Sequence, residues 1–517
     1  MFVSVVRFQM LGPVVLPRLR LIADSSRNRQ PVITNAGYSS PPGMTGSQQT
    51  AGTVTTAVQP VCIFVMDSSS TLVPPQSTPI KHGTTTMARF TTNHKYRQKE
   101  MSDMGDEMRD YIVGPMPTSR FLNEFFPKKS IQSTDKAKVY RPGCFDKVVS
   151  CSDEIQAYAP FVRSIHYDHP LTCIHFMLQI KAAAPFAPNL KFVNSSTHVD
   201  CSGQTDFSFE IKPDVCAYLK GGRHLGPTDV ARAELIIEFK WHLADDPFCD
   251  PYIPSGAEHT TIFREGKTCA DTLGQITSYA AAQLGSQFRT CIYSVLIVKD
   301  KARLIRWDRT GAIVTEAFCY NSNRTLAEFF RRYHKAPPNI RGVDTTVTVP
   351  TPDEIRLARE CLRFGEHTRY VKMTVPALSL KSVQSYIVAV PKAGPYTPPG
   401  RATRGFVAFD LQRGRQVYLK DTWRVDLPGI EKEGETYRLM EEAQVLNISP
   451  CSAAGDIKDH CTCTHLYNNK PWACKARKEL VPHHNYRLVL DIIGGSLTTF
   501  SSSREMLGCI VDALQGR

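Results

Sequence analysis

Hydrophobic positions between residues 150 and 335 switch between a helical period and the short continuous apolar runs that are typical of buried strands. These patterns predict helices at residues 154–166, 270–285 and 326–333, and strands at residues 207–211, 235–239, 291–298 and 302–307. An amphipathic stretch at residues 108–126 precedes them and marks where ordered structure is expected to begin. Strands mixed with helices in this way indicate an α/β domain.

A second set of elements follows a proline-rich stretch at residues 337–352. Proline interrupts helices and strands, so we interpret this stretch as a linker, and a short helix at residues 353–364 leads out of it. Beyond residue 366 the pattern predicts antiparallel hairpins around one helix. The predicted elements are strands at residues 385–390, 405–410, 416–420 and 486–490 and a helix at residues 431–442.

Composition separates the N-terminal part of the chain from these domains. Residues 23–100 are dominated by Ser, Thr, Pro, Gly and Gln, which cannot bury enough apolar surface to offset the entropy of ordering, so we expect disorder there. Residues 1–100 hold 10 Lys and Arg against 3 Asp and Glu, a large share of the net charge of +13. A solvated basic tail is the simpler interpretation, and contact with nucleic acid or a membrane surface is the alternative.

These observations predict a multidomain chain that combines α/β and α+β parts. The expected parts are a disordered basic leader at residues 1–105, an α/β domain at 106–345, a linker with a short helix at 346–365, and a second domain at 366–517. Within the α/β domain, residues 167–190 look like an insertion between a helix and residues 191–194.

Cysteine usage and hydropathy restrict the class of protein. The 16 cysteines are scattered without the spacing of a disulfide framework, which indicates reduced thiols in an intracellular protein of the cytoplasm or nucleus rather than a secreted one. No run of 18 apolar residues occurs, so no membrane-spanning helix is expected.

Cysteine and histidine residues crowd one predicted loop between residues 451 and 484. They are Cys451, His460, Cys461, Cys463, His465, Cys474, His483 and His484. Zinc sites usually present their four ligands in paired short knuckles, whereas the spacing here is Cys-x-Cys. An ordinary loop is therefore preferred to a zinc site.

Three residues of the α/β domain form a candidate site for metal-assisted hydrolysis. Glu238 and Lys240 are two positions apart along a predicted strand, so their side chains project from the same face. A hairpin could bring Asp214, which follows an earlier predicted strand, beside Glu238. Two carboxylates placed in this way offer the hard oxygen ligands that suit Mg²⁺, and a neighbouring lysine can position an attacking water.

This arrangement resembles the PD-(D/E)XK nuclease superfamily. The resemblance implies that Asp214 and Glu238 are metal ligands and that Lys240 is the catalytic lysine. Gln275 and Tyr279, one helical turn apart, match the Q-x-x-x-Y element that is often found on the following helix.

The superfamily also tends to supply an acidic residue from its first helix, for which Glu154 is the candidate, while Arg163 stands where a carboxylate would be expected. A chance match of acidic and basic residues at strand ends is the alternative interpretation. A fold of this kind can also persist without its activity.

Residues 400–420 carry the pattern of a nucleotide clamp. Gly400, Gly405 and Val407 approximate G-x-G-x-x-G-x-V, with Ala402 in place of the middle glycine. The backbone N–H groups of such turns can close over phosphates, and Lys420 on the next strand would reach them.

The elements after this clamp would complete the small lobe of a protein kinase. Glu435 lies in the next predicted helix, and we expect it to pair with Lys420 and to fix the ammonium group against the phosphates. The last predicted strand would then lead into the hinge, with Leu490 as gatekeeper, and residues 502–514 would form the first helices of the large lobe. The backbone of Asp491 and Ile493 would face the adenine edge.

Several short sequence motifs spread over residues 110–517 resemble those of one protein family. They occupy residues 274–281, 304–311, 326–330, 341–346, 419–424, 433–437 and 502–506. Together they resemble the fungal-type protein kinase family, which couples a nuclease-like α/β region to a protein kinase domain. The resemblance implies binding of ATP with Mg²⁺ and phosphotransfer to a Ser, Thr or Tyr hydroxyl of a protein.

The sequence nevertheless contains neither a His-Arg-Asp nor an Asp-Phe-Gly motif. The catalytic base and the second metal-binding aspartate that phosphoryl transfer requires are therefore missing, and this form is expected to be inactive as a kinase or a fragment. Two other functions stay open. One is a metal-dependent nuclease, and the other is a non-catalytic module whose exposed lobe surface binds a protein partner.

Overall fold

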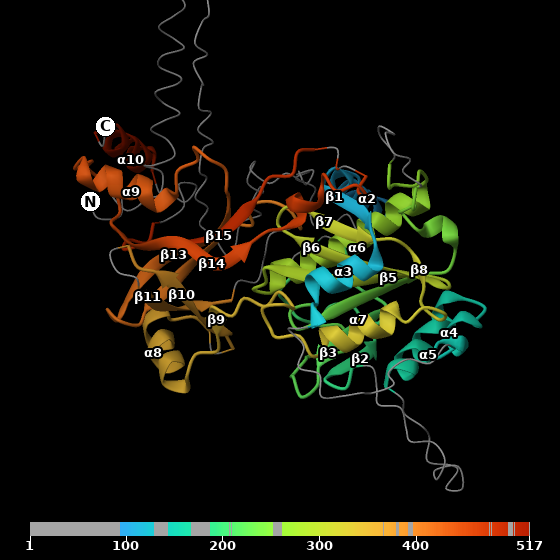
Figure 1. The fold of residues 1–517 in the computed structure, drawn as a ribbon. Helices are drawn as coiled ribbons and strands as arrows, with labels where there is room; N and C mark the ends of the chain where they lie inside the picture. The colour runs from blue at the N-terminus through green and yellow to red at the C-terminus, as the bar shows by residue number, and fades with distance from the viewer. Residues whose placement is uncertain are drawn as a thin grey trace, which may run out of the picture.

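The computed structural model describes residues 94–515, apart from residues 129–142, 167–186, 252–260, 379–381, 391–396, 495–499 and six single positions. The described chain forms two lobes side by side, each built around one β-sheet (Figure 1). We call residues 94–345 the first lobe and residues 346–515 the second lobe. Most of the predicted leader lies outside the described residues, but residues 94–105, which it included, are helical.

The sheet of the first lobe has eight strands in the order β1-β7-β6-β5-β4-β3-β2, with β8 paired to β6. The strands are β1 (Ile112–Met116), β2 (Leu190–Asn194), β3 (Val215–Leu219), β4 (Leu235–Lys240), β5 (Cys291–Val298), β6 (Lys301–Asp308), β7 (Ala312–Thr315) and β8 (Phe318–Cys319). Strands β2, β3 and β4 form an antiparallel meander, whereas β4 pairs in parallel with β5. A parallel pair needs a crossover, and the long helix α6 (Lys267–Ser286) supplies it.

Helices cover both faces of this sheet. They are α2 (His94–Met108), α3 (Thr118–Phe125), α4 (Asp146–Val149), α5 (Glu154–His166), α6 and α7 (Thr325–Tyr333). Helices α3, α5 and α7 pack on one face around Phe161 and Phe330, and α2 and α6 pack on the other. Helices α2 and α6 approach closely at Gly274, where an added Cβ would lie 2.0 Å from the main-chain oxygen of Met101.

Most predicted elements of this lobe are confirmed, but one predicted strand is wrong, and β1, β2, β3, β7 and β8 were not predicted. The predicted helices correspond to α5, α6 and α7, and the strands at residues 235–239, 291–298 and 302–307 correspond to β4, β5 and β6. The predicted strand at residues 207–211 is wrong, because Phe209 and Ile211 lie in a loop that packs on the core. Of the suspected insertion at residues 167–190, only the last residues are described, and β2 begins at Leu190.

The second lobe is a seven-stranded sheet in the order β14-β15-β13-β12-β11-β10-β9, antiparallel throughout. Its strands are β9 (Val347–Thr348), β10 (Tyr370–Pro376), β11 (Val383–Ala389), β12 (Arg404–Asp410), β13 (Arg415–Val425), β14 (Cys451–Cys461) and β15 (His483–Leu490). Its helices are α8 (Pro352–Leu362), α9 (Glu433–Glu442) and α10 (Ser503–Gln515). The predicted hairpins and the predicted helices at residues 353–364, 431–442 and 502–514 are therefore confirmed, while β9, β10 and β14 were not predicted.

Helix α9 follows β13 in the chain and covers one face of the sheet, where Tyr437 packs against Tyr418 and Leu488. Helix α8 covers another part of the same face, because Ile387 and Phe409 contact it there. The opposite face holds a second apolar cluster against which Phe288 of the first lobe packs. The two lobes therefore share buried surface.

A connection between β14 and β15, residues 462–482, reaches across to the first lobe. Its Tyr467 and Leu480 are buried in the first lobe's core, and the N–H of Cys474 donates to the oxygen of Gly114 at 2.7 Å. The cysteine and histidine residues that were predicted to share a loop are instead divided between this connection and the two long strands. His483, for example, lies buried on β15.

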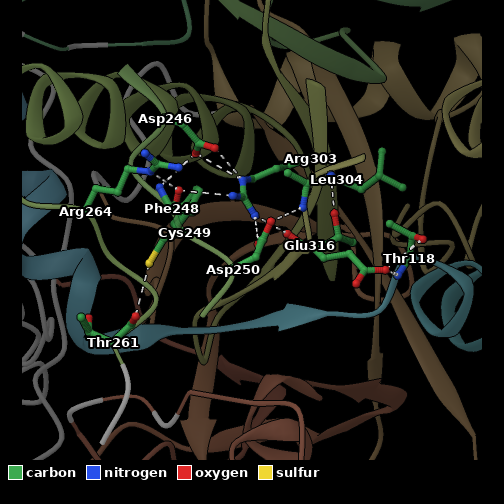
Figure 2. A network of polar contacts seen from close by, with 12 residues as sticks. Thr118, Asp246, Phe248, Cys249, Asp250, Thr261, Arg264, Arg303, Leu304 and Glu316 are labelled. Atoms are coloured by element: carbon green, nitrogen blue, oxygen red, sulfur yellow. Dashed lines mark hydrogen bonds and ion pairs between the residues drawn. The ribbon is translucent and has the colours of Figure 1, made fainter. Parts of the chain in front are cut away.

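Polar contacts hold the segment after β4 against the sheet of the first lobe (Figure 2). Arg303 on β6 donates from Nε to Asp246 at 3.0 Å, from Nη1 to Asp250 at 2.6 Å, and from Nη2 to the oxygen of Phe248. Arg264 donates to that same oxygen at 2.8 Å. Within the described residues, no helix combines the length and the apolar character that crossing a membrane would need.

Candidate functional site

The hairpin of β3 and β4 brings together the three residues of the candidate hydrolytic site. Asp214 directly precedes β3, and its Oδ2 accepts a hydrogen bond from the N–H of Phe239 at 2.8 Å. Lys240 donates from Nζ to Glu238 Oε1 at 2.5 Å and to the oxygen of Phe239 at 2.9 Å. The predicted placement of Asp214 beside Glu238 is therefore present.

This cluster is almost sealed from solvent. Glu238 is 2% exposed and Asp214 is 8% exposed. Burial, together with the nearby charge of Asp214, raises the pKa of Glu238 well above its usual value. Burial also raises the pKa of Asp214, against the opposing effect of Lys240. For Lys240 itself, burial alone would lower the pKa, but the carboxylates of Glu238 and Asp214 outweigh it and the pKa is raised.

Helix α5 adds a third carboxylate to the surroundings of the cluster. Glu154 is the first residue of α5, and its Oε1 accepts a hydrogen bond from the hydroxyl of Tyr158 at 2.8 Å. Burial raises the pKa of Glu154, while the charge of Lys240 lowers it and that of Asp214 raises it further. The pKa of Glu154 therefore responds to the charges of Lys240 and Asp214. Tyr158 was not predicted, and its spacing of one helical turn from Glu154 was the signal available in the sequence.

Gln275 and Tyr279 of α6 support the site through the backbone of Lys212 rather than through its carboxylates. Gln275 Nε2 donates to the hydroxyl of Tyr279 at 2.8 Å, and that hydroxyl donates to the oxygen of Lys212 at 2.8 Å. Lys212 lies two residues before Asp214. The pair therefore fixes the backbone that presents Asp214, which is a positioning role.

The donor set of this cluster fits a hard cation such as Mg²⁺. Its ligands would be the carboxylate oxygens of Asp214 and Glu238, and Glu238 Oε2 is buried without a hydrogen-bond partner, so a cation would satisfy it. Across the described parts of the chain, no group of three or more Cys, His, Asp or Glu side chains is placed to hold a metal ion. Further ligands would therefore have to come from water, the backbone or the substrate.

In the second lobe, Lys420 pairs with a different glutamate from the predicted one. Lys420 is fully buried on β13, and its Nζ donates to Glu433 Oε2 at 2.6 Å. Glu435 instead lies on the exposed side of α9, where it pairs with Arg438. The prediction of Glu435 was wrong because two positions along a helix differ by roughly 200° in direction. Glu433, in the first turn of α9, faces the sheet.

The predicted glycine cover is also wrong in its geometry. The N–H of Gly400 donates to the oxygen of Arg309 in the first lobe at 2.8 Å, which ties this turn to the lobe interface. Gly405 and Val407 lie within β12, directly opposite Lys420 and Tyr418 of β13. Gly405 and Val407 therefore lie in the strand predicted at residues 405–410, whereas Gly400 contacts the other lobe.

The residues predicted to form a hinge lie at the end of β15. Leu490 is buried as its last residue, and Ile493 packs partly buried against the same cluster. The N–H of Asp491 already donates to the oxygen of Pro450 at 3.0 Å, and its carboxylate binds Arg415 at 2.5 Å. An adenine edge would therefore have to displace an existing partner of the Asp491 N–H.

Comparison with protein-family models, with curated proteins and with solved structures found no match to this chain.

Proposed function

We propose that the first lobe is a metal-dependent phosphodiesterase of the PD-(D/E)XK nuclease type, acting on nucleic acid. The convergence of Asp214, Glu238 and Lys240 at one end of the β3–β4 hairpin carries this proposal. These residues come from two separate segments of the chain and are fixed to one another by main-chain and side-chain hydrogen bonds. Such a cluster of buried charges has a folding cost, which makes a chemical role a better explanation than a structural one.

Each residue of the cluster has a separate role in this proposal. Asp214 and Glu238 would hold Mg²⁺, which when bound supplies Lewis-acid stabilisation of charge on a phosphodiester. The raised pKa of Lys240 keeps its ammonium protonated near neutral pH, so it can donate to a phosphate oxygen or orient a water. The raised pKa of Glu238 means that it must lose a proton before it can bind a cation, so activity should increase with pH.

The test is cleavage of plasmid DNA and of single-stranded RNA by the full chain, with Mg²⁺ and with EDTA. We expect Mg²⁺-dependent cutting that falls by about 100-fold or more in Glu238→Gln and in Lys240→Met. The matched control is Lys372→Met, which removes a similar lysine–glutamate pair at Glu354 in the second lobe. Cleavage that is unchanged in folded Glu238→Gln, or no cleavage of any nucleic acid, would exclude the proposal.

A second candidate, binding of ATP with Mg²⁺ by the second lobe, is favoured by the ion pair of Lys420 and Glu433. A strand lysine held by a helix glutamate is the arrangement that positions nucleotide phosphates in protein kinases. It agrees with the resemblance to the fungal-type protein kinase family, with Glu433 in the place first given to Glu435. Phosphotransfer to protein hydroxyls would follow only with further catalytic groups.

This candidate is tested by equilibrium dialysis of the full chain with labelled ATP and Mg²⁺. Binding should disappear in Lys420→Met and persist in Lys432→Met, which changes an exposed lysine at the start of the same helix. Equal binding by both variants, or none by the unmodified chain, would contradict it. Transfer of label to a generic protein substrate, measured in parallel, reports on kinase activity separately.

A further inference from the structure

Two buried arginines meet where the lobes join. Arg309 follows β6 in the first lobe, and Arg404 begins β12 in the second. They are only 1% and 4% exposed. Both donate from Nη2 to the main-chain oxygen of Leu284, at 3.0 Å and 2.7 Å, so two like charges lie next to each other in a region that excludes water.

Among the described residues, the hydrogen-bond acceptors of these guanidinium groups are neutral main-chain oxygens. Arg309 Nη1 donates to the oxygens of Thr397 and Pro398, both at 3.0 Å, and Arg404 Nη2 donates to the oxygen of Gln287 at 3.1 Å. The Arg404 guanidinium also lies over an aromatic ring of the first lobe, 5.0 Å from its centre. Carbonyl oxygens carry only partial charges, even at the C-terminal end of a helix.

Two carboxylates line the same cavity and share a third arginine. Asp344 and Asp421 both accept from Arg487, at 2.5 Å and 3.1 Å, so three buried guanidinium groups stand against two carboxylates. In the described part of the chain, no ion pair within 4.0 Å includes either member of the pair. The interface therefore contains an excess of positive charge.

The same excess is visible in the protonation behaviour of the pair. Burial, and then the neighbouring charge of Arg404, lower the pKa of Arg309 to about 9. Burial likewise lowers the pKa of Arg404. An arginine that stays charged at neutral pH in such a place needs a compensating negative charge.

A small cavity lies between these side chains. Its lining includes Arg309, Arg404, Thr290, His460 and Asn485, together with the two engaged aspartates named above. Its volume is about 10 Å³, which is room for one water-sized particle. Arg309 Nε is buried without a hydrogen-bond partner. A polyatomic anion such as phosphate is too large for this space, whereas a monatomic anion is not.

We propose that a monatomic anion of the size of chloride binds in this cavity, between Arg309 and Arg404, and joins the two lobes. The anion supplies the negative charge that the interface lacks and accepts the N–H of Arg309 Nε. Because each lobe contributes one of the arginines, binding requires the assembled interface and stabilises it. The site is separate from the carboxylate cluster of the first lobe and from the Lys420–Glu433 pair.

The first test compares thermal unfolding of the full chain in sodium chloride and in sodium gluconate at equal ionic strength. We expect the midpoint to rise with chloride and to level off, about 2–4 °C higher at about 200 mM. Arg404→Met should abolish this difference, whereas Arg356→Met, which changes an exposed arginine on α8, should retain it. Equal midpoints in the two salts, or an undiminished difference in Arg404→Met, would overturn the proposal.

The second test needs no variant and decides the matter if Arg404→Met does not fold. Crystals of the unmodified chain grown in bromide should show an anomalous peak between the Arg309 and Arg404 guanidinium groups. Density for a water alone at that position, or anomalous peaks only elsewhere, would show that the interface holds its charge without an anion.

Discussion

Replacing Glu238 by glutamine should change how the stability of the protein depends on pH. The carboxyl group of Glu238 is buried, its Oε2 has no hydrogen-bond partner, and its pKa is raised by burial and by Asp214. The folded protein therefore keeps a proton that the unfolded chain releases near pH 4.5. This stabilising contribution is complete below that pH and is lost as the pH rises towards the folded-state pKa.

The size of the effect follows from proton linkage. One proton held only by the folded state lowers the free energy of unfolding by about 1.4 kcal/mol for each pH unit. Above pH 4.5 the unmodified chain should therefore lose about 1.4 kcal/mol per pH unit through this group until the folded-state pKa is reached. Glutamine has nearly the same shape and cannot ionise, so the stability of Glu238→Gln should lack this dependence on pH.

Urea unfolding with EDTA present, at pH 5, 6 and 7, measures this difference directly. The control is Glu354→Gln, because the pKa of Glu354 is lowered, mainly by its hydrogen bond from the backbone of Thr351, and its contribution runs in the opposite direction. Parallel curves of free energy against pH for the unmodified chain and Glu238→Gln would refute the reasoning. They would show that Glu238 is ionised in the folded protein from pH 5 upwards.

Three further changes test other parts of the structure by denaturant unfolding. Glu433→Gln should cost about 3–5 kcal/mol, because it leaves the buried Lys420 ammonium without its carboxylate, whereas Glu435→Gln on the exposed side of α9 should leave stability unchanged. Gly274→Ala should destabilise by about 2–4 kcal/mol, because the new methyl group would meet a main-chain oxygen of α2 at 2.0 Å. Arg487→Met should lower the free energy of unfolding by about 3–5 kcal/mol, because Asp344 and Asp421 lose their shared partner. If any of these three variants is as stable as the unmodified chain, the contact that it disrupts does not stabilise the fold.

The hydrolytic cluster could be predicted from sequence because each step depended on local geometry. The strand period fixes Glu238 and Lys240 on one face, and the helical period fixes Gln275 beside Tyr279. Asp214 required one assumption about a hairpin, which the pairing of β3 with β4 supports. Apolar runs likewise predicted β4, β5 and β6, because burial against helices on both faces leaves few polar positions in these strands.

The Lys420 site was predicted less accurately, because its geometry depends on where a helix begins. Patterning placed a helix at residues 431–442, but a shift of its phase by two residues exchanges the buried glutamate for the exposed one. The buried position is marked only by tertiary contacts, since the N–H of Gly434 donates to the hydroxyl of Tyr486 and draws the first turn onto the sheet. No periodicity in the sequence contains that information.

The position of Gly400 depends on a hydrogen-bond partner in the other lobe. The two lobes are also not separate folding units. A boundary near residue 345 separates the two sheets, but it does not separate the two cores, because Tyr467 and Leu480 belong to the first one. Asp308 adds a polar connection, since its Oδ2 accepts from the N–H groups of Cys463 and Thr464 at 3.0 Å and 3.1 Å. The two lobes that carry the candidate sites therefore form one continuous structure. A change that loosens the interface between the lobes should lower the activity or ligand affinity of both sites.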